Sequence, residues 1–329
     1  MFLCFVGSVF GAEYVWTGGG DGATWTDVAN WGGSGCPGEN DNATFSSGAE
    51  VTITSDITVN QIYLNASSKV TCDSNVTISL NSIITQGEFL NKGTLQKREN
   101  VSFIIKVEAG GKLINENKII CTDIEGLGNS NITNNGTIEA SGAATFQSGA
   151  NFTNADTSEL SIDGAMRNEG TFSNSGGTVT VKGTTTNTGT ITNTGDFTSE
   201  GAITNNNGGK ITNNSSGTIS GDIDNTGSFE NSGTIAGAIT NNAGGTVTNN
   251  GGEISGEVSG EGTFENNYST ISFDTVLDWN DASSWENGVK PNISGKTAVT
   301  ITLNGDVNIS DFQDFFAAGN KTITLNGTG

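Results

Sequence analysis

Apolar and polar residues alternate along short stretches of the chain, and most of these stretches follow a turn-forming phrase. Residues 178–181 read Thr-Val-Thr-Val, and Ile211 precedes Thr212 in the same way. A period of two residues is typical of β-strands with one buried face. The pattern therefore predicts strands whose apolar side chains point inward and whose Thr or Asn side chains point outward.

A phrase of Asn, a variable residue and Gly recurs from about residue 85 to residue 265. Asn and Gly tolerate positive φ, and the β-branched or aromatic residue that follows opens an extended segment. Each copy therefore predicts a turn followed by a short strand. The clearest copies are NNGTI at 134–138, NEGTF at 168–172, NTGTI at 187–191, NTGDF at 193–197, NTGSF at 225–229 and NSGTI at 231–235.

The spacing of the glycines in these phrases predicts stacked coils. Short and long steps mostly alternate, but every second glycine lies 16 to 22 residues further on. A period near 18 to 20 residues that holds two or three short strands is typical of a β-solenoid. We therefore expect an all-β fold: an elongated β-solenoid, as a right-handed parallel β-helix, with Trp-containing modules that start or cap the coils.

Two further features support stacked coils in residues 85–268. Asn at equivalent turn positions can stack into hydrogen-bonded ladders, and the absence of Pro fits because Pro would remove a backbone donor. The alternative for this region is a disordered low-complexity linker. It is disfavoured because Ile, Val or Phe recurs at the same offset from each Gly.

One Trp motif lies on both sides of the repeats. Trp25 and Trp31 have the same spacing as Trp279 and Trp285, and one of the two prolines follows each pair. We therefore divide the chain into a truncated signal peptide (1–12), an N-terminal W-x5-W β module (13–84), Asn/Gly/Thr-rich solenoid repeats (85–268) and a second, partial copy of the module (269–329).

The first module carries a Trp, a Gly-rich turn, the W-x5-W motif, Pro, Asp, a small residue and Phe, followed by a Val/Thr strand. In this order it resembles bacterial autotransporter-associated β-strand repeat proteins and related adhesin-like β-helical surface proteins of the passenger type. The resemblance implies an exported β-helix displayed at the cell surface, and the second copy lacks counterparts of Trp16 and Asp41. The matching residues are Trp16, Gly18, Gly19, Gly20, Trp25, Asn30, Trp31, Pro37, Asp41, Ala43 and Phe45.

The paired tryptophans have two possible roles. Large aromatic side chains suit the open end of a solenoid, where they shield the core and the unpaired strand edge. Alternatively, Trp25, Trp31, Trp279 and Trp285 form ligand-binding platforms for sugar rings. Because Trp is largely buried on average, we prefer the structural cap.

The chain is strongly acidic, with 13 Lys and Arg against 35 Asp and Glu, no His and a net charge of -22. Between residues 118 and 290 only three cations occur, so no basic surface is expected there for nucleic-acid phosphates. The same charge disfavours binding to anionic membranes. The denser basic run at 92–118 is interleaved with Glu and indicates a solvated face.

The start of the chain predicts export. MFLCFVGSVFGAE is an apolar run that ends in small residues before Glu13, as in a secretory signal, although a buried first strand is the alternative. It is shorter than the ~20 residues of a membrane span. We therefore expect no integral membrane segment and a location at the bacterial cell surface, in the outer membrane or outside the cell. One disulfide, such as Cys36 to Cys72, is compatible with export, and the pairing stays open.

No catalytic group stands out. Without His there is no Ser-His-Asp triad or His metal ligand, and the cysteines lack zinc spacing. Acidic pairs such as Asp222 with Asp224, Asp311 with Asp314 and Glu253 with Glu257 are best explained as solvated turn positions. GGGDG at 18–22 occurs once, which is too little for a calcium repeat. We expect no catalytic site, no metal and no cofactor.

These observations favour a non-enzymatic, secreted or surface-displayed stalk or adhesin fragment that attaches to glycans or to host or neighbouring cell-surface molecules. A β-helical polysaccharide lyase or glycosidase is one alternative. An ice-binding solenoid is another, prompted by the Thr-rich run at 183–198. The unequal steps between its Thr residues count against a flat, regular ice-binding face.

Overall fold

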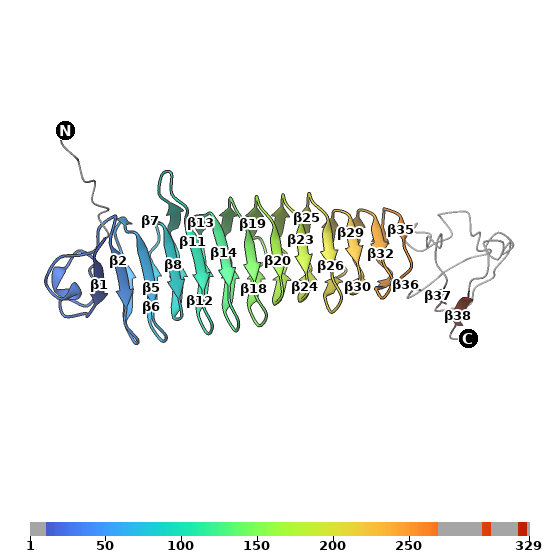
Figure 1. The fold of residues 1–329 in the computed structure, drawn as a ribbon, viewed down its shortest axis with the longest axis horizontal. Coiled ribbons are helices and arrows are strands. Elements are labelled where there is room, and N and C mark those ends of the chain that lie inside the picture. Colours follow the sequence, from blue (N-terminus) through green and yellow to red (C-terminus); the bar gives the residue numbers. More distant parts are fainter. Residues whose placement is uncertain (1–10, 269–297, 304–321, 328–329) are drawn as a thin grey trace, which may run out of the picture. The chain divides into compact units, whose positions relative to one another are not determined.

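The computed structural model describes residues 11–268, 298–303 and 322–327. The chain divides into two compact units, Met1–Phe152 and Thr153–Gly329. Each unit is a parallel β-solenoid, so the predicted all-β solenoid fold is confirmed (Figure 1). The signal-like residues 1–10, Trp279, Trp285, Asp311 and Asp314 lie outside the described residues.

Three parallel sheets, named A, B and C, form the sides of the first unit, and each full coil gives one strand to each sheet. Sheet A contains β1 (Glu13–Trp16), β2 (Asn42–Phe45), β5 (Gln61–Leu64), β8 (Ser82–Thr85), β11 (Ile104–Val107), β14 (Asp123–Gly126) and β17 (Ala144–Phe146). Sheet B contains β3 (Glu50–Ile53), β6 (Lys69–Cys72), β9 (Glu88–Asn91), β12 (Lys112–Asn115) and β15 (Asn131–Asn134). Sheet C contains β4 (Ile57–Thr58), β7 (Thr77–Leu80), β10 (Thr94–Lys97), β13 (Lys118–Cys121) and β16 (Thr137–Ala140). A short 3₁₀-helix, η1 (Val28–Trp31), precedes the coils, and β18 (Asn151–Asn154) lies at the boundary between the units.

The second unit repeats this three-sheet arrangement. Sheet A contains β20 (Met166–Asn168), β23 (Thr185–Asn187), β26 (Ile203–Asn205), β29 (Ile223–Asn225), β32 (Ile239–Asn241) and β35 (Val258–Ser259). Sheet B contains β21 (Thr171–Asn174), β24 (Thr190–Asn193), β27 (Lys210–Asn213), β30 (Ser228–Asn231), β33 (Thr246–Asn250), β36 (Thr263–Tyr268), β37 (Ala298–Leu303) and β38 (Thr322–Gly327). Sheet C contains β19 (Glu159–Ile162), β22 (Thr178–Val181), β25 (Asp196–Ser199), β28 (Thr218–Ser220), β31 (Thr234–Ala236) and β34 (Glu253–Ile254).

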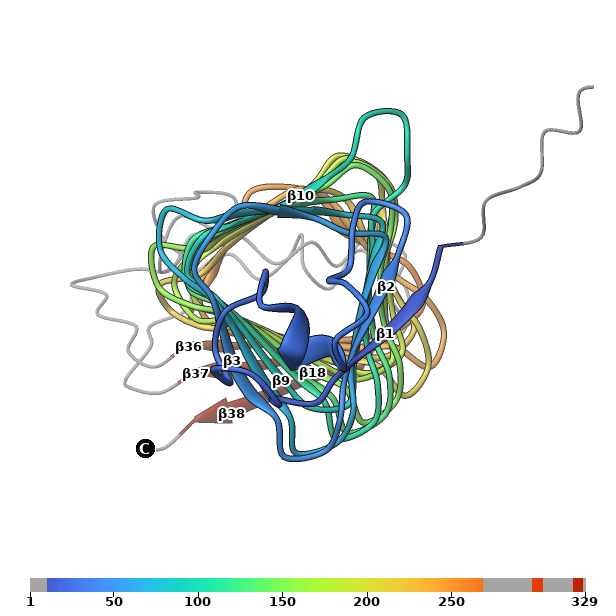
Figure 2. The same cartoon turned by 90° about the vertical axis from the view of Figure 1, so that its left-hand side faces the viewer.

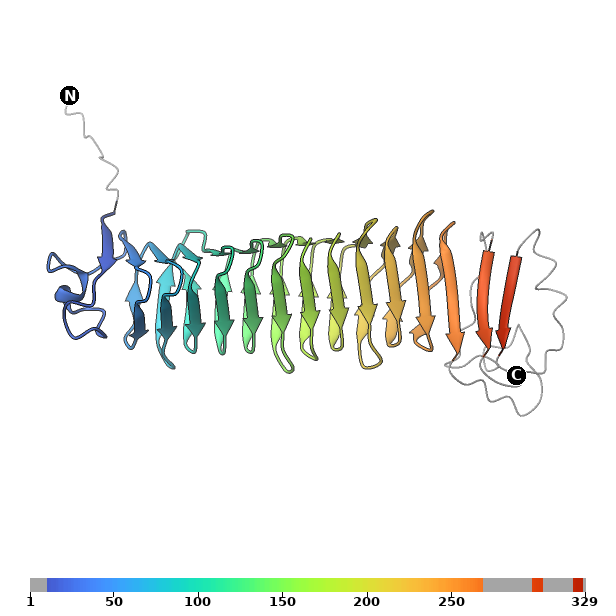
Figure 3. The ribbon, with the colours of Figure 1, turned by 90° about the horizontal axis from the view of Figure 1, so that it is seen from below.

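The coils advance in regular register. Glu50 pairs with Lys69, and Thr171 pairs with Thr190, both steps of 19 residues. From the N-terminal end of the first unit, the chain runs clockwise from β2 to β3 and on to sheet C as it recedes, so the solenoid is right-handed (Figure 2). Within each unit, strands of one sheet lie side by side and point the same way (Figure 3).

Apolar side chains fill the inside of the coils, as the alternation predicts. In sheet B of the first unit, Val70, Phe89, Leu113 and Ile132 occupy one inward column, each at most 1% exposed. Their neighbours along each strand point outward. Burial of these stacked columns supplies the main driving force for folding.

The prediction that Asn points outward is wrong for the Asn at the ends of β21, β24, β27 and β30. Asn174, Asn193, Asn213 and Asn231 are fully buried, and each side-chain amide donates to the amide oxygen of the next. A second buried ladder runs from Asn168 through the equivalent Asn side chains to Asn241 in the same unit. Because an identical amide lies one coil away, the ladder amides satisfy one another without water, except at the start of the second ladder, where the buried amide oxygen of Asn168 has no partner among the described residues.

The glycine of the phrase is required for space and not for positive φ. A Cβ at Gly195 would lie 2.2 Å from the carbonyl oxygen of Gly177 in the preceding coil, and one at Gly189 would lie 2.1 Å from that of Gly170. Neither Gly195 nor Gly189 has a left-handed backbone. The coils therefore approach closely at these corners, and this contact explains the recurring Gly.

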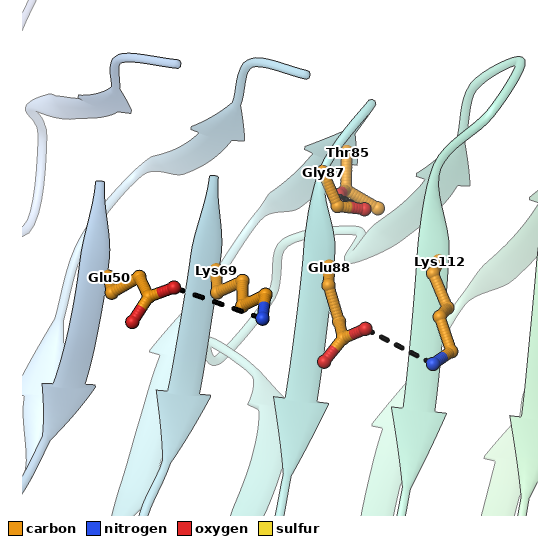
Figure 4. A network of polar contacts seen from close by, with 6 residues as sticks. All are labelled: Glu50, Lys69, Thr85, Gly87, Glu88 and Lys112. Carbon is orange, nitrogen blue, oxygen red and sulfur yellow. Dashed lines mark hydrogen bonds and ion pairs between the residues drawn. The ribbon is translucent and has the colours of Figure 1, made fainter. Parts of the chain in front are cut away.

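The outer face of sheet B in the first unit carries alternating charges. Glu50, Lys69, Glu88 and Lys112 follow one another at one register position. The Lys69 ammonium lies 3.8 Å from the Glu50 carboxylate, and that of Lys112 lies 3.1 Å from Glu88 (Figure 4). Such exposed ion pairs each contribute little to the stability of the fold. The order of charges nevertheless avoids like-charge neighbours on adjacent strands, which would be destabilising.

Candidate functional site

An aromatic cluster closes the N-terminal end of the first unit. Trp31 lies 4.8 Å from both Trp16 and Trp25 between ring centroids, and all three rings contact Phe45 of β2 at centroid distances between 5.7 and 6.2 Å. The Trp31 indole donates to the carbonyl oxygen of Trp25 at 2.7 Å. The cluster therefore covers the inward column that begins at Phe45.

The W-x5-W loop is held by its polar residues. The Asn30 amide oxygen accepts from the backbone of Gly20 and Gly22, and its amide nitrogen donates to the Asp21 carboxylate at 2.8 Å. Hydrogen bonds, first of all from the Thr24 hydroxyl, hold the pKa of the Asp21 carboxyl well below its ordinary value. These interactions fix the loop and occupy the carboxylate that the GGGDG sequence had offered as a calcium ligand.

The tryptophans considered as sugar platforms are buried where the structure describes them. Trp25 is 4% exposed and Trp31 is 3% exposed, so neither presents a ring face to a ligand. Among the described residues, no group of three or more acidic or Cys side chains is placed to hold a metal ion. Trp25 and Trp31 therefore belong to the packed interior of the module.

One coil differs from its neighbours by an insertion. Six residues, 98–103, separate β10 from β11, whereas one residue separates β7 from β8. The coil step rises accordingly to 24 residues between Glu88 and Lys112. The resulting loop stands out from the outline of the coils (Figure 2). Insertions in a repeat map to loops on one face, which is often the binding face.

The insertion loop is anchored at its end and turns on Asn100. Phe103 is fully buried, and its backbone nitrogen donates to the Thr122 hydroxyl at 3.0 Å. Asn100 adopts a left-handed conformation with φ of 59°, which Asn tolerates better than most residues. The loop is therefore a defined part of the fold.

A polar groove of about 350 Å³ lies beside this loop on the outer face of sheet C. Its floor consists of Thr58, Ser79 and Gln96, which occupy one register position on β4, β7 and β10. The Gln96 amide donates to the Ser79 hydroxyl at 3.0 Å. Its remaining lining residues are Glu39, Lys97, Arg98 and Glu99.

Arg98 joins the loop to the N-terminal module. Its guanidinium donates to the main-chain oxygen of Glu39 at 2.6 Å and lies 3.6 Å from the Glu39 carboxylate. The Arg98 side chain is only 19% exposed. This contact spans 59 residues of sequence and closes one side of the groove. We call the groove and its seven lining residues the loop groove.

Sequence reasoning missed the loop groove because it interpreted residues 92–118 as a solvated charged face. That interpretation describes Lys112 and Lys118, which form ion pairs on the surface. The interpretation as a solvated face overlooks Gln96 and Arg98, which line the loop groove. The available signal was the long interval between NKGTL at 91–95 and NENKI at 115–119, which exceeds the usual coil length.

The three described cysteines are free, so the suggested Cys36–Cys72 disulfide is not formed. The Cys72 thiol points inward and contacts the main-chain oxygens of Asp73 and Val76. Burial raises the pKa of the Cys72 and Cys121 thiols to about 12. Both therefore behave as small core residues with inert thiols.

The acidic pair Asp222 and Asp224 connects neighbouring coils. Asp222 accepts a hydrogen bond from the backbone nitrogen of Ala238 at 3.0 Å, and Asp224 accepts one from the amide of Asn242 at 3.1 Å. Asp224 lies on β29, so the interpretation of both as turn positions is wrong for this residue. Both carboxylates have structural partners.

The comparisons with known proteins give one family match. No curated protein and no solved structure matches the chain. In the described part of the chain, no helix has the length and apolar character needed to cross a membrane. Residues 30–150, which include the loop groove and most of the first unit, match the family model described as the G8 domain, so this part of the chain is similar to that family.

Proposed function

We propose that this protein is a non-enzymatic, exported attachment protein, a bacterial surface stalk or adhesin that displays binding surfaces along stacked coils. The observation that carries the proposal is the loop groove, a polar recess beside the six-residue insertion between β10 and β11. Glycans or other cell-surface molecules are its proposed partners.

The coil stack suits display. Backbone hydrogen bonds connect each coil to the next, such as Thr190 to Gly170 at 2.8 Å and Lys210 to Gly189 at 2.8 Å. A solenoid of this kind grows by adding coils, and its side chains outside the core are free to vary. Many copies of such a protein on one surface turn weak contacts into firm attachment through multivalency.

Binding in place of catalysis is favoured by how the acidic residues are used. Carboxylates proposed as catalytic pairs in a β-helical lyase or glycosidase must converge on one bond of the sugar. In the second unit Asp222 and Asp224 instead accept hydrogen bonds from Ala238 and Asn242 of the next coil. Turnover of a polysaccharide panel, measured as new reducing ends, would contradict the non-enzymatic proposal.

The test of attachment compares single molecules with a multivalent surface. Beads coated with the protein are expected to adhere to glycan-bearing cells or to extracted extracellular matrix, while the soluble protein binds the same surfaces weakly. Beads coated with an unrelated acidic protein of similar net charge are the control. Equal adhesion of both bead types, or no adhesion to any surface, would reject the proposed function.

An ice-binding solenoid remains a second candidate because the spacing argument against it is wrong. Thr192 and Thr212 are paired in register on adjacent strands although the sequence steps are unequal, since the turns absorb the difference. However, Lys210 follows Thr190, Glu230 follows Thr212, and these two charged residues form an ion pair at 2.9 Å. Thermal hysteresis in dilute solution would support this candidate, and its absence would dismiss it.

A further inference from the structure

We propose that the loop groove binds a neutral oligosaccharide that lies across strands β4, β7 and β10, with its chain along the direction of coil stacking. This inference rests on the proposed attachment function and assigns it to a site. It is carried by three features of the groove: the order of its floor, the balance of its charges and the chemistry of its lining residues.

The floor repeats at the spacing of the coils. Thr58 pairs with Ser79, and Ser79 pairs with Gln96, so one polar side chain is presented per strand. Adjacent strands lie ~4.8 Å apart, which is about the length of one sugar ring. Successive rings of a chain that lies along the stack therefore meet successive polar groups.

The floor is also prepared for hydrogen bonding. The bond from the Gln96 amide to the Ser79 hydroxyl, 3.0 Å long, orients both groups before a ligand arrives. Hydroxyls and amides serve as both donors and acceptors, as sugar hydroxyls do. Preorganised groups of this kind lose little freedom on binding, which favours affinity.

The charges of the loop groove balance although the chain carries a net charge of -22. The lining contains two acidic residues, Glu39 and Glu99, and two basic residues, Lys97 and Arg98. Arg98 is already engaged by Glu39. A polyanionic ligand would meet a strongly acidic protein without a compensating basic patch. A neutral ligand avoids this repulsion.

The lining favours a glycan over a peptide. Peptide recognition uses a free sheet edge or apolar pockets for anchor side chains. The groove lies over the outward side-chain face of β4, β7 and β10, and although β4 is the outermost strand of sheet C, no apolar pocket for an anchor side chain lies beside it among the lining residues. All seven lining residues are polar or charged. Hydroxyl-rich surfaces fit such a lining better than apolar anchors do.

The experiment measures binding of the whole protein to an array of neutral, acidic and amino-sugar oligosaccharides, followed by titration of neutral hexasaccharides. Gln96→Ala and Ser79→Ala are expected to weaken binding of a neutral hexasaccharide about tenfold, because each removes a hydrogen-bonding group. The matched control is Thr198→Ala, a half-buried position on the outer face of sheet C in the second unit. It is expected to bind as the parent does, and circular dichroism checks that all variants are folded.

The outcomes separate this inference from the proposed function. Tenfold weaker binding in both floor variants, with the Thr198→Ala control unchanged, supports the inference. Adhesion of the coated beads with unchanged glycan binding in Gln96→Ala and Ser79→Ala, or adhesion to peptide surfaces or acidic glycans alone, overturns it and leaves attachment standing. No adhesion and no glycan binding overturns both.

Discussion

At the residue scale, the N-x-G phrase combines two different requirements at one corner of the coil. Its Asn points inward and joins a ladder of amides, while its Gly leaves room for the carbonyl of the preceding coil. Asn193 and Gly195 show both within three residues. A repeated phrase that resembles a simple turn signal therefore encodes the contact between coils.

Removing one ladder amide should destabilise the second unit. Asn193 donates to Gly195, Asn213 and Thr218 at 2.8 to 3.0 Å and accepts from Asn174 at 2.8 Å. We expect Asn193→Ala to lower the free energy of unfolding by at least about 2 kcal/mol, since it leaves buried polar groups without partners. The neighbouring outward Thr192→Ala should change it by less than about 0.5 kcal/mol.

Urea denaturation followed by circular dichroism measures this pair of variants. Asn193→Asp adds a sharper comparison, because a buried carboxylate is costly when charged. It should be more destabilising at pH 7 than at pH 4. Equal stabilities of the Asn193→Ala and Thr192→Ala variants would mean that the ladder contributes nothing.

In sheet B of the first unit the Asn ladder begins at Asn91 on β9, and the preceding strand β6 has no Asn at the paired position. This gap predicts a stabilising substitution. Asn91 donates to Asn115 at 2.7 Å, but its buried amide oxygen has no hydrogen-bond partner in the described structure. Cys72 occupies the equivalent position on the preceding strand. We expect Cys72→Asn to donate to Asn91 and raise the free energy of unfolding by about 1 kcal/mol.

The same substitution at Cys121 is the control for that gain. Cys121 pairs in register with Ala140, whose side chain has no amide oxygen that could accept a hydrogen bond. Cys121→Asn should therefore destabilise the protein by burying an unpaired amide. Denaturation curves in which both Asn variants lose stability would refute the proposed extension of the ladder.

The two buried thiols predict a loss of stability in alkali. Burial raises the pKa of Cys72 and Cys121 from 9.0 to about 12, so the folded state keeps protons that the unfolded state releases. Stability is then complete below about pH 8.5 and falls between pH 9 and pH 12, by about 1.4 kcal/mol per pH unit for each thiol. Unfolding in urea between pH 8 and pH 11 should give a smaller slope for Cys121→Ala than for the parent. Identical slopes would contradict the assignment.

At the element scale, turns differ in why they need Gly, and substitutions should separate the two reasons. A Cβ at Gly195 would meet a carbonyl oxygen at 2.2 Å, whereas Gly208 has φ of +85° and open space around its Cα. Gly195→Ala and Gly195→Asn should each cost at least about 2 kcal/mol through overpacking. Gly208→Ala should lower the free energy of unfolding by about 1 kcal/mol. Gly208→Asn should lower it less, because Asn tolerates the left-handed region. A Gly195→Asn variant as stable as Gly208→Asn would show that space is not limiting.

The strands and their period could be predicted from sequence, because alternation and recurring glycines are local signals. The inward direction of Asn193 could not, since a polar side chain is expected to face water until its partner Asn213 is placed one coil away. The loop groove was also missed, because its residues come together only in the folded chain. Gln96 lies beside Ser79 once β10 pairs with β7, and Arg98 reaches Glu39, which is 59 residues away in sequence. Local pattern therefore identifies elements, and stacking decides what their side chains do.

At the scale of the whole molecule, stability is built from contacts between neighbouring coils. Each described strand within the solenoid units pairs with the strand one coil before or after it, as β24 does with β21 and β27. In such a stack, stability is approximately a sum of coil terms and neighbour terms. A local defect should therefore act first on the coils next to it.

A defect in one coil should therefore loosen its neighbours and spare distant coils. In the Asn193→Ala variant we expect faster hydrogen exchange at the backbone amides of β21, β24 and β27, because local opening needs only the contacts of those coils to break. Amides of β7, β10 and β13 in the first unit should exchange at the parent rate. Mass spectrometry of proteolytic fragments after exchange measures both regions in one sample, and Thr192→Ala controls for substitution itself. A uniform rise in exchange across both units would instead make the protein one cooperative body, in which a weakened coil endangers the loop groove as well as its own neighbours.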